Sequence, residues 1–370
     1  MQTSIDIVIP SFRLNEAFLL PMLRLPKPAG LDIKYYLIAD NPAIKPGQAL
    51  SDLIDNKTVF LLVNEQNMGA GLTRNRGIDA GTGEWILFID DDVQVRDDLL
   101  FAYAKALEQF PNETGFAGMV ALEEPINDFT RAISLNKTLD IFRVAADFPH
   151  TAWAATANVM VKRSAIGDIR FSAAIPRTGG GEEVDFFLKV KEKNNDRNLK
   201  CLPAAWVTHP WWGGGKMNLK RNFYYGIGNS ILIMRNQRYA WNGFFNTVEI
   251  LFFSTITGLA LLFTRPRLLP AVFLFMLFTV LLEYLYQIVN IYQQTRKVEL
   301  KTAFLNMLIN IADDGGVLAG NLQRFRLKGI GERFNYDGNP VTRNYQFNRK
   351  KIFKFVLYLI AIIILIRCFN

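Results

Sequence analysis

A run of five apolar residues that stops at three consecutive aspartates is the feature that most constrains this chain. Residues 85–89 read Trp-Ile-Leu-Phe-Ile, and residues 90–92 are all aspartate. An unbroken apolar run rich in aromatic and β-branched residues is typical of a buried strand in a parallel sheet. Ligands of open α/β sheets bind at the carboxyl ends of the strands, so we expect these carboxylates to face a crevice. Because side chains alternate along a strand, Asp90 and Asp92 can point the same way and bind a hard divalent cation together.

Three earlier segments of the chain have the same strand-like character and also end in polar residues. These segments are residues 5–9, 35–39 and 59–63. A segment with helical spacing follows the first of them, and a glycine-rich helix entry at residues 67–77 follows the third. Strands that alternate with helices in this way predict an α/β fold with a doubly wound parallel sheet. The strand ends that we expect along one edge are residues 10–12, 40–41, 64–67 and 90–92.

The hydrophobic residues are unevenly distributed along the chain. They make up 50% of it, and the excess lies in residues 244–263, 268–292 and 352–366. The net charge is +8, and basic residues gather beside these apolar runs, which indicates a membrane surface and argues against a nucleic-acid partner. Cys201 and Cys368 provide neither a disulfide framework nor a metal cluster, as is typical of a reducing compartment. The chain begins with strand-like sequence and not with a signal peptide, so we expect its N-terminal part in the cytoplasm.

Five motifs occur in an order that resembles the family 2 glycosyltransferases of GT-A fold. They are Ile9-Pro10-Ser11-Phe12, Asp40-Asn41, Asn67 to Asn75 with Gly69, Gly71 and Arg74, Phe88-Ile89-Asp90-Asp91-Asp92, and Gly181-Glu182-Glu183-Val184-Asp185. The resemblance covers roughly residues 3–230. It implies a Rossmann-like, mostly parallel catalytic domain that transfers a sugar from a nucleotide-sugar donor.

The resemblance also implies which residues bind the donor. The candidates are Pro10, Ser11, Phe12, Asp40, Asn67, Arg74, Asp90 and Asp91. Phe12 could stack on the base, and a packing role is equally compatible with a single phenylalanine. Asp40 could accept a hydrogen bond from a uracil N–H or a ribose hydroxyl, and Arg74 would approach the base and the phosphates. Asp91 could contact the ribose.

The metal ligands implied by the resemblance are Asp90 and Asp92, with His209 as a third. The cation would be Mg²⁺ or Mn²⁺, between which the sequence does not choose, and it would stabilise the negative charge on the departing nucleoside diphosphate. A lone histidine is more often structural, but His209 follows a strand at a point where the family often places a metal or diphosphate contact. His150, the second histidine, has no such support.

Three carboxylates after a glycine-rich approach at residues 177–181 are the candidates for the catalytic base. Glu183 ranks first, and Glu182 and Asp185 rank below it. The family usually has Glu-Asp at this point, with the second residue as the base, whereas this chain has Glu-Glu. The base would take the proton of an acceptor hydroxyl as its oxygen attacks the anomeric carbon opposite the diphosphate, which inverts the configuration. An alternative for both glutamates is simple stabilisation of a helix N-terminus.

Candidates for the acceptor site are weaker. Trp211 and Trp212 could form an apolar platform for a sugar, and a place at the membrane interface explains them equally well. Residues 123–150, where this fold usually meets its acceptor, match no motif. The chain lacks the Gln-x-x-Arg-Trp pattern of processive synthases such as cellulose synthase, so extrusion of a long polymer is not expected.

The C-terminal part of the sequence predicts a membrane anchor with its basic flanks on the cytoplasmic side. The predicted segments are 1–215 for the catalytic domain, 216–243 for a basic and aromatic juxtamembrane segment, 244–292 for a transmembrane helical hairpin, 293–350 for a cytoplasmic amphipathic segment and 351–370 for a C-terminal transmembrane helix. Arg265 and Arg267 in the hairpin turn leave a hairpin within one leaflet as an alternative. Glu249 and Glu283 lie inside the apolar segments, where we expect each to face a partner or a polar cavity.

These patterns predict a membrane-anchored, inverting, metal-dependent glycosyltransferase at the cytoplasmic face of the inner membrane. Its donor would be a nucleotide sugar, for example a UDP-sugar, and its acceptor a lipid-linked or surface-polysaccharide hydroxyl. Transfer to a polyprenyl phosphate is a variant of the same prediction. A sugar nucleotidyltransferase would need a glycine-rich basic loop after the first strand, which residues 10–14 do not provide. A catalytically silent membrane scaffold is a further alternative, against which the acidic clusters at residues 90–92 and 182–185 argue.

Overall fold

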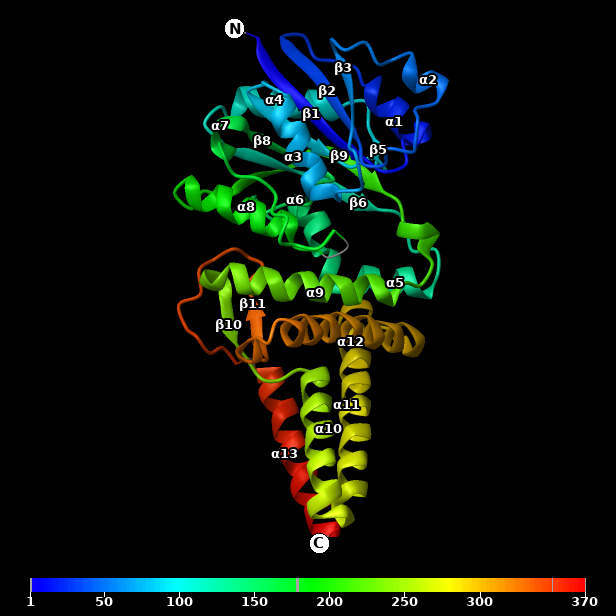
Figure 1. Cartoon of the computed structure of the whole chain (residues 1–370), viewed down its shortest axis with the longest axis vertical. Helices are drawn as coiled ribbons and strands as arrows, with labels where there is room; N and C mark the ends of the chain where they lie inside the picture. Colours follow the sequence, from blue (N-terminus) through cyan, green and yellow to red (C-terminus); the bar gives the residue numbers. More distant parts are fainter. Residues whose placement is uncertain (1, 178–179, 348, 370) are drawn as a thin grey trace. The chain divides into compact units, whose positions relative to one another are not determined.

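The computed structural model describes residues 2–177, 180–347 and 349–369. They form two compact units (Figure 1). The sheet unit consists of Met1–Glu124 and Thr138–Gly215, and the helical unit consists of Pro125–Lys137 and Lys216–Asn370. A short internal segment therefore packs with the C-terminal part of the chain, although the sequence around it belongs to the sheet unit.

A mixed nine-stranded sheet is the centre of the sheet unit in the described part of the chain. Its main path is β3-β2-β1-β4-β8-β6-β9-β5, and β7 pairs with β9. The strands are β1 Thr3–Ser11, β2 Leu31–Ala39, β3 Val59–Val63, β4 Trp85–Ile89, β5 Gln94–Val95, β6 Gly115–Leu122, β7 His150–Thr151, β8 Asn158–Lys162 and β9 Leu199–His209. The helices are α1 Glu16–Leu23, α2 Gln48–Ser51, α3 Ala70–Ala80, α4 Leu99–Gln109, α6 Val144–Asp147, α7 Arg163–Ile166 and α8 Glu182–Lys193, with 3₁₀ segments η1 Lys137–Arg143 and η2 Trp212–Gly215.

The predicted α/β fold with a largely parallel sheet is confirmed, but β8 runs in the opposite direction. Strands β3, β2, β1 and β4 are parallel neighbours, whereas β8 is antiparallel to both β4 and β6. The reversal arises because β8 begins at the carboxyl edge, where Asn158 pairs with Ile89, the last residue of β4. A parallel strand would require a crossover back to the other edge. The next long strand, β9, is parallel to β6 and so runs in the direction of β4 again.

Alternate residues of the central strands face two different apolar cores. Ile7 of β1 and Leu87 of β4 belong to one core, together with residues of α1, α2 and α4. Val8 and Phe88 belong to the other core, together with residues of α3, α7 and α8. Helices therefore cover both faces of the sheet, and β4 is apolar throughout because both of its faces are buried. The three aspartates begin directly after the last residue of β4, where the chain is only half-buried.

The helical unit contains longer helices. Its elements are α5 Asp128–Leu135, α9 Leu219–Arg235, η3 Gln237–Tyr239, β10 Ala240–Asn242, α10 Thr247–Thr264, η4 Pro266–Leu268, α11 Leu269–Thr295, α12 Leu300–Gln323, η5 Leu327–Gly329, β11 Glu332–Phe334 and α13 Arg349–Phe369. Helices α9 and α12 cross very closely, because a Cβ on Gly316 of α12 would lie 1.9 Å from the carbonyl oxygen of Phe223 in α9. Helix α12 also packs against α5, α10 and α11, and β10 pairs with β11 in a small antiparallel ribbon.

Among the described residues, three helical segments are long and apolar enough to cross a membrane: Thr247–Thr264, Pro266–Thr295 and Lys351–Phe369. Only 22%, 11% and 6% of their most apolar windows are buried, so most of their apolar side chains face outward. A hydrocarbon environment stabilises such a surface, whereas exposure to water costs free energy. The short segment η4 connects α10 to α11, and these two helices pack against each other.

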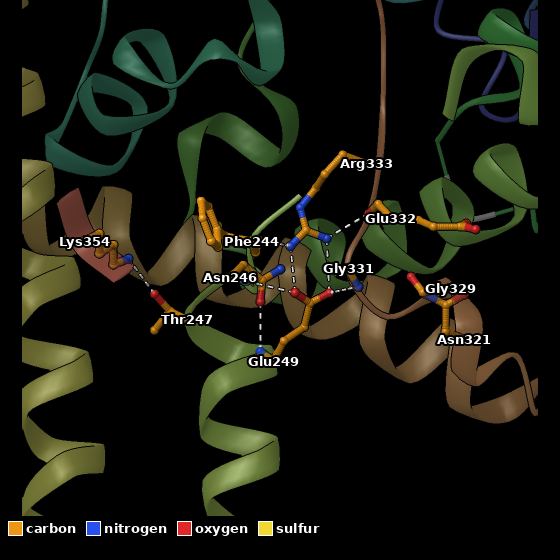
Figure 2. A network of polar contacts seen from close by, with 10 residues as sticks. All are labelled: Phe244, Asn246, Thr247, Glu249, Asn321, Gly329, Gly331, Glu332, Arg333 and Lys354. Atoms are coloured by element: carbon orange, nitrogen blue, oxygen red, sulfur yellow. Dashed lines mark hydrogen bonds and ion pairs between the residues drawn. The ribbon is translucent and has the colours of Figure 1, made fainter. Parts of the chain in front are cut away.

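Both glutamates of these apolar segments have partners, as expected. Glu249 accepts hydrogen bonds from Arg333 (Nη2 to Oε2, 2.6 Å) and from the backbone N–H of Asn246, in a reciprocal cap of α10 (Figure 2). Glu283 of α11 forms an ion pair with Lys354 of α13. Each carboxylate is thus neutralised by a cation from a distant part of the chain, which offsets the cost of burying its charge.

Candidate active site

Strand directions bring the acidic motif and His209 to the same edge of the sheet. Asp90 follows the last residue of β4, and His209 is the last residue of β9. The two reversals at β8 restore the direction of β4 in β9, so both strands end on the same side. The short strand β5, which starts two residues after Asp92, pairs with β9 at Val207 and Thr208 and holds the two strand ends together.

Asp90, Asp92 and His209 form a group that could hold a metal ion. Each offers one ligand atom, and these atoms all lie within 4.8 Å of one another. His209 Nδ1 lies 2.7 Å from the carbonyl oxygen of Pro210. Because a carbonyl oxygen only accepts, Nδ1 carries the proton and Nε2 keeps its lone pair, 3.5 Å from Asp92 Oδ1. The ring is 3% exposed and its centroid lies 4.8 Å from that of Trp212, which fixes its orientation.

The donor set of this group fits Mg²⁺ or Mn²⁺. Two carboxylates and one neutral imidazole nitrogen suit a hard or borderline divalent cation, and a soft metal would require thiolates. The two aspartates are half-buried, so the group lies at the surface of the sheet edge where further ligands can reach it. Arg74 and Arg13 also lie beside it, with ion pairs of 2.6 Å to Asp90 and 3.6 Å to Asp92.

Asp91 points to a different partner from its two neighbours. Its Oδ2 accepts a hydrogen bond of 2.5 Å from the hydroxyl of Ser11, and that hydroxyl accepts one from the backbone N–H of Leu14. Burial, together with repulsion from Asp92 and Asp90, raises the pKa of Asp91 to about 6. The carboxyl ends of β1 and β4 are therefore joined by side chains at the centre of the site.

Asp40, at the end of β2, holds the glycine-rich turn before α3. Its Oδ1 accepts hydrogen bonds from the Asn64 side chain and from the backbone N–H of Met68, and its Oδ2 accepts one from the N–H of Gly69. Gly69 has a φ of +84°, a conformation that a residue with a Cβ rarely adopts. Asn67 caps the same turn through its side-chain oxygen, which accepts from the N–H of Gly69. These contacts position the N-terminus of α3 and with it Arg74.

Arg74 is buried between the acidic groups. It is 3% exposed, and its Nη2 donates to Asp90 at 2.6 Å. Its Nε and Nη1 are buried without a hydrogen-bond partner among the described residues. The guanidinium carbon lies 5.8 Å from the centre of the Phe171 ring, which supports it from one side. Two unmatched buried donors in a cation beside a carboxylate cluster are unusual and point to an anionic or carbonyl partner.

The glutamate pair at the start of α8 also interacts with Arg74 electrostatically. Gly181, with a φ of +104°, precedes the helix, and Glu183 accepts a hydrogen bond of 3.3 Å from Thr156. Burial, with repulsion from Glu183, raises the pKa of Glu182 to about 8. Burial also raises the pKa of Glu183, and Arg74 opposes this shift. The raised pKa values of these carboxylates lie near the pH range in which a general base works.

The remaining predicted residues differ in exposure. Phe12 is 48% exposed at the end of β1, whereas Pro10 is buried in that strand. Asp185 is fully buried and forms an ion pair of 2.5 Å with Lys189. Trp211 is 4% exposed, and its indole N–H donates to the carbonyl oxygen of Glu124. Trp212 is half-buried beside His209.

Sequence reasoning missed three side chains in this region. Arg13 approaches Asp92, Asn64 joins Asp40, and Thr156 joins Glu183. Asn64 lies within residues 64–67, which the sequence predicts at this edge because they follow β3 as Asp40 follows β2, but it was not named as a site residue. Thr156 is 27 residues before its partner, and no local pattern marks it.

The comparison with protein families identifies the N-terminal part of the chain. The model described as glycosyl transferase family 2 matches residues 6–170. Over these residues, which make up less than half of the chain, the protein is similar to family 2 glycosyl transferases. The match confirms the resemblance of the sequence motifs and includes the strand ends from Ser11 to Asp92. Glu183 and His209 lie beyond the matched range, so their connection with the family 2 domain rests on the geometry above.

Solved structures are similar to this chain only at low identity. S. aureus TarS is 14% identical, with 61% of this chain and 39% of that chain covered and a TM-score of 0.42. The mannosyltransferase PcManGT from Pyrobaculum calidifontis, in complex with GDP-Man and Mn²⁺, is 14% identical. The match covers 63% of this chain and 64% of that chain, with a TM-score of 0.45. The chain thus spans about two fifths of the TarS chain. Among curated protein sequences, none matches it significantly.

Proposed function

We propose that the sheet unit transfers a sugar from a nucleotide-sugar donor to an acceptor hydroxyl with inversion at the anomeric carbon. The observation that carries this proposal is the convergence of two acidic groups on Arg74. Asp90, Asp92 and His209 supply ligand atoms within 4.8 Å of one another, and Asp90 binds Arg74 directly. The glutamates that begin α8 are close enough to Arg74 for its charge to oppose the rise in their pKa values.

Asp90, Asp92 and His209 would hold Mn²⁺ or Mg²⁺ in this proposal. Such a cation neutralises the donor diphosphate and stabilises the charge on the leaving group. Arg74 supplies two further N–H donors that have no partner among the described residues, and we assign them to the phosphates or to the base. The residues at the ends of β1 to β3 would form the nucleoside side of the site. They are Pro10, Ser11, Phe12, Asp40, Asn67 and Asp91.

Glu183 would be the catalytic base. Its carboxylate is oriented by Thr156 and lies close enough to Arg74 for the guanidinium to affect its pKa. It would accept the proton of the acceptor hydroxyl as the acceptor oxygen bonds to the anomeric carbon and the bond to the diphosphate breaks. Glu182 is the next candidate, since one of its oxygens is buried without a hydrogen-bond partner among the described residues. Asp185 ranks last, because its fully buried carboxylate is already bound to Lys189.

The acceptor is proposed to be bound to a membrane. Three apolar helical segments in the described part of the chain are long enough to span one. The basic residues beside them would place the sheet unit at the cytoplasmic face of the inner membrane. A lipid-linked or surface-polysaccharide acceptor would explain why the catalytic chain carries such segments. Trp212, half-buried beside His209, is the candidate for an acceptor contact.

Release of nucleoside diphosphate by the detergent-purified full-length protein tests this proposal. The protein is offered UDP-, GDP- and dTDP-sugars with Mn²⁺ or Mg²⁺, next to the variant Asp92→Asn. We expect slow hydrolysis of one donor that requires the metal and falls roughly a hundredfold or more in the variant. The matched control is Asp79→Asn, an exposed carboxylate on α3 that is ion-paired with Arg170 away from the metal ligands.

Two outcomes would contradict the proposal. One is the absence of release from every donor together with no metal-dependent binding of any nucleotide. The other is equal loss of activity in Asp79→Asn and Asp92→Asn, because the effect would then come from general damage to the sheet unit.

A further inference from the structure

The helical unit contains a cavity, lined by both polar and apolar side chains, at one end of its apolar helices. Its volume is about 280 Å³, near the lower end of the ~300–1,000 Å³ typical of small-molecule sites. Asn246 and Thr247 line it from the start of α10, Lys351 and Lys354 from the start of α13, and Glu283 from the second half of α11. The cavity therefore lies at the end of the hairpin opposite the turn η4. In a membrane-spanning bundle this is the depth of the lipid head groups.

Three cations converge on the cavity from two segments of the chain. They are Arg333 of β11 and Lys351 and Lys354 of α13. Arg333 is held by Glu249, as Figure 2 shows, and Lys354 is held by Glu283. Lys351 lies with its Nζ 5.6 Å from the centre of the Trp241 ring. Cations in a partly desolvated site attract anions more strongly than cations in open water do.

Hydrogen-bonding groups line the side of the cavity formed by α11 and α12. They are the amides of Gln287 and Asn310 and the carboxyls of Asp313 and Asp314. Burial raises the pKa of both aspartates to about 7, so each is partly protonated near neutral pH and can donate as well as accept. Such a lining is suited to hydroxyl groups.

A buried tyrosine hydroxyl lines the same cavity. Tyr358 is 4% exposed and lines the cavity. Its oxygen lies beside Lys354 and Thr247 but makes no well-aligned hydrogen bond among the described residues. Buried polar atoms are normally satisfied by protein, ordered water or ligand. The rings of Phe244 and Phe355, stacked with centroids 4.6 Å apart, form an apolar part of the wall.

We propose that this cavity binds the head group of a membrane lipid that carries a phosphate ester. The phosphate would be held by Lys351, Lys354 and the Tyr358 hydroxyl, and hydroxyl groups attached to it would bond to Asp313 and Asn310. The aromatic rings would contact the first carbons of the lipid chain. The inference rests on the membrane location in the proposed function, but it needs neither the metal nor the sugar donor.

Two kinds of lipid carry this chemistry: a bilayer phospholipid and a polyprenyl phosphate. Binding to the full-length protein in detergent is measured by native mass spectrometry with phosphatidylglycerol and with polyprenyl phosphate. Diacylglycerol and polyprenol, which lack the phosphate, are the respective neutral control ligands. We expect at least one phosphate lipid to bind roughly tenfold or more tightly than its neutral counterpart. The lipid whose affinity exceeds that of its neutral counterpart by the larger ratio is then the source of the head group.

Lys351→Gln is the decisive variant, because it removes a cation without leaving Glu249 or Glu283 unpaired. We expect it to reduce the preference for the phosphate lipid severalfold or more. Lys297→Gln removes the same charge from an exposed position after α11 and should leave that preference unchanged. Tyr358→Phe removes only the hydroxyl and provides a second test if Lys351→Gln does not fold.

The proposal is wrong if no phosphate lipid binds more tightly than its neutral counterpart. It is also wrong if Lys297→Gln lowers the preference as much as Lys351→Gln, which would indicate general surface charge, or if neither Lys351→Gln nor Tyr358→Phe changes it. Failure of the proposed function is separate: donor hydrolysis would be absent while these binding ratios stayed as expected.

Discussion

The two units of this protein treat buried carboxylates in opposite ways. In the sheet unit, Asp90 and Asp92 lie close together with His209 at a half-buried edge, beside Arg74 and Arg13. In the helical unit, Glu249 and Glu283 are buried singly, each with its own cation. A fold depends on the partner of a buried carboxylate, because loss of that partner leaves the charge uncompensated, whereas grouped carboxylates at a rim can share a metal cation. We therefore expect substitutions in the first group to affect chemistry and substitutions in the second to affect stability.

The largest effect that we expect concerns the sheet unit. Glu183→Gln keeps the hydrogen bond from Thr156 but cannot accept a proton, so turnover should fall by roughly 10²- to 10⁴-fold. Affinity for the donor and the thermal unfolding temperature should change little. Sugar transfer and donor binding are measured separately. A larger loss in Glu182→Gln than in Glu183→Gln would move the base to Glu182.

A substitution at a carboxylate of the helical unit should instead lower the stability of the protein. Glu249→Gln leaves Arg333 buried without its anion and weakens the cap of α10, and removal of one partner of a buried pair costs ~3–5 kcal/mol. We expect a clear fall in the unfolding temperature in detergent, followed by fluorescence. An unchanged unfolding temperature in Glu249→Gln would contradict this comparison, because the ion pair between Glu249 and Arg333 would then not stabilise the fold.

Substitutions at Gly315 and Gly316 test the packing of the helical unit without a change in charge. In Gly316→Ala the new Cβ would meet the carbonyl oxygen of Phe223 at 1.9 Å, so α9 and α12 must separate, and overpacking of this kind costs ~1–3 kcal/mol. In Gly315→Ala the nearest side-chain atom of Phe223 is 3.7 Å away, an ordinary contact. That neighbouring change should be neutral or slightly stabilising, because alanine favours a helix. Equal unfolding temperatures for the two variants would contradict the close crossing.

The smallest effect should come from an exposed ion pair. Asp128 and Lys301 are 51% and 75% exposed, and such pairs contribute less than about 1 kcal/mol. Asp128→Asn should therefore leave the unfolding temperature nearly unchanged, in contrast to Glu249→Gln in the same unit. A large shift would show that exposure does not separate the two classes of acid.

Much of this architecture could be predicted because local sequence patterns depend on near neighbours. The apolar run before Asp90 identifies β4 and the edge where it ends, and the three apolar runs identify α10, α11 and α13. The reversal of β8 could not be predicted, because it depends on the edge from which the chain re-enters the sheet. The position of residues 125–137 in the helical unit was equally hidden, since α5 packs on α12, which lies far away in sequence.

The sequence by itself determined where the carboxylates stand along the chain, since strand ends and helix starts follow from residue spacing. Tertiary structure decided which of them meet. Asp92 and His209 become neighbours only because two reversals in the sheet align β4 with β9, and Glu249 gains Arg333 from a strand 84 residues away. The physical reason is that periodicity reports which face of an element is buried, whereas the partner of a buried charge depends on how distant elements pack against that face.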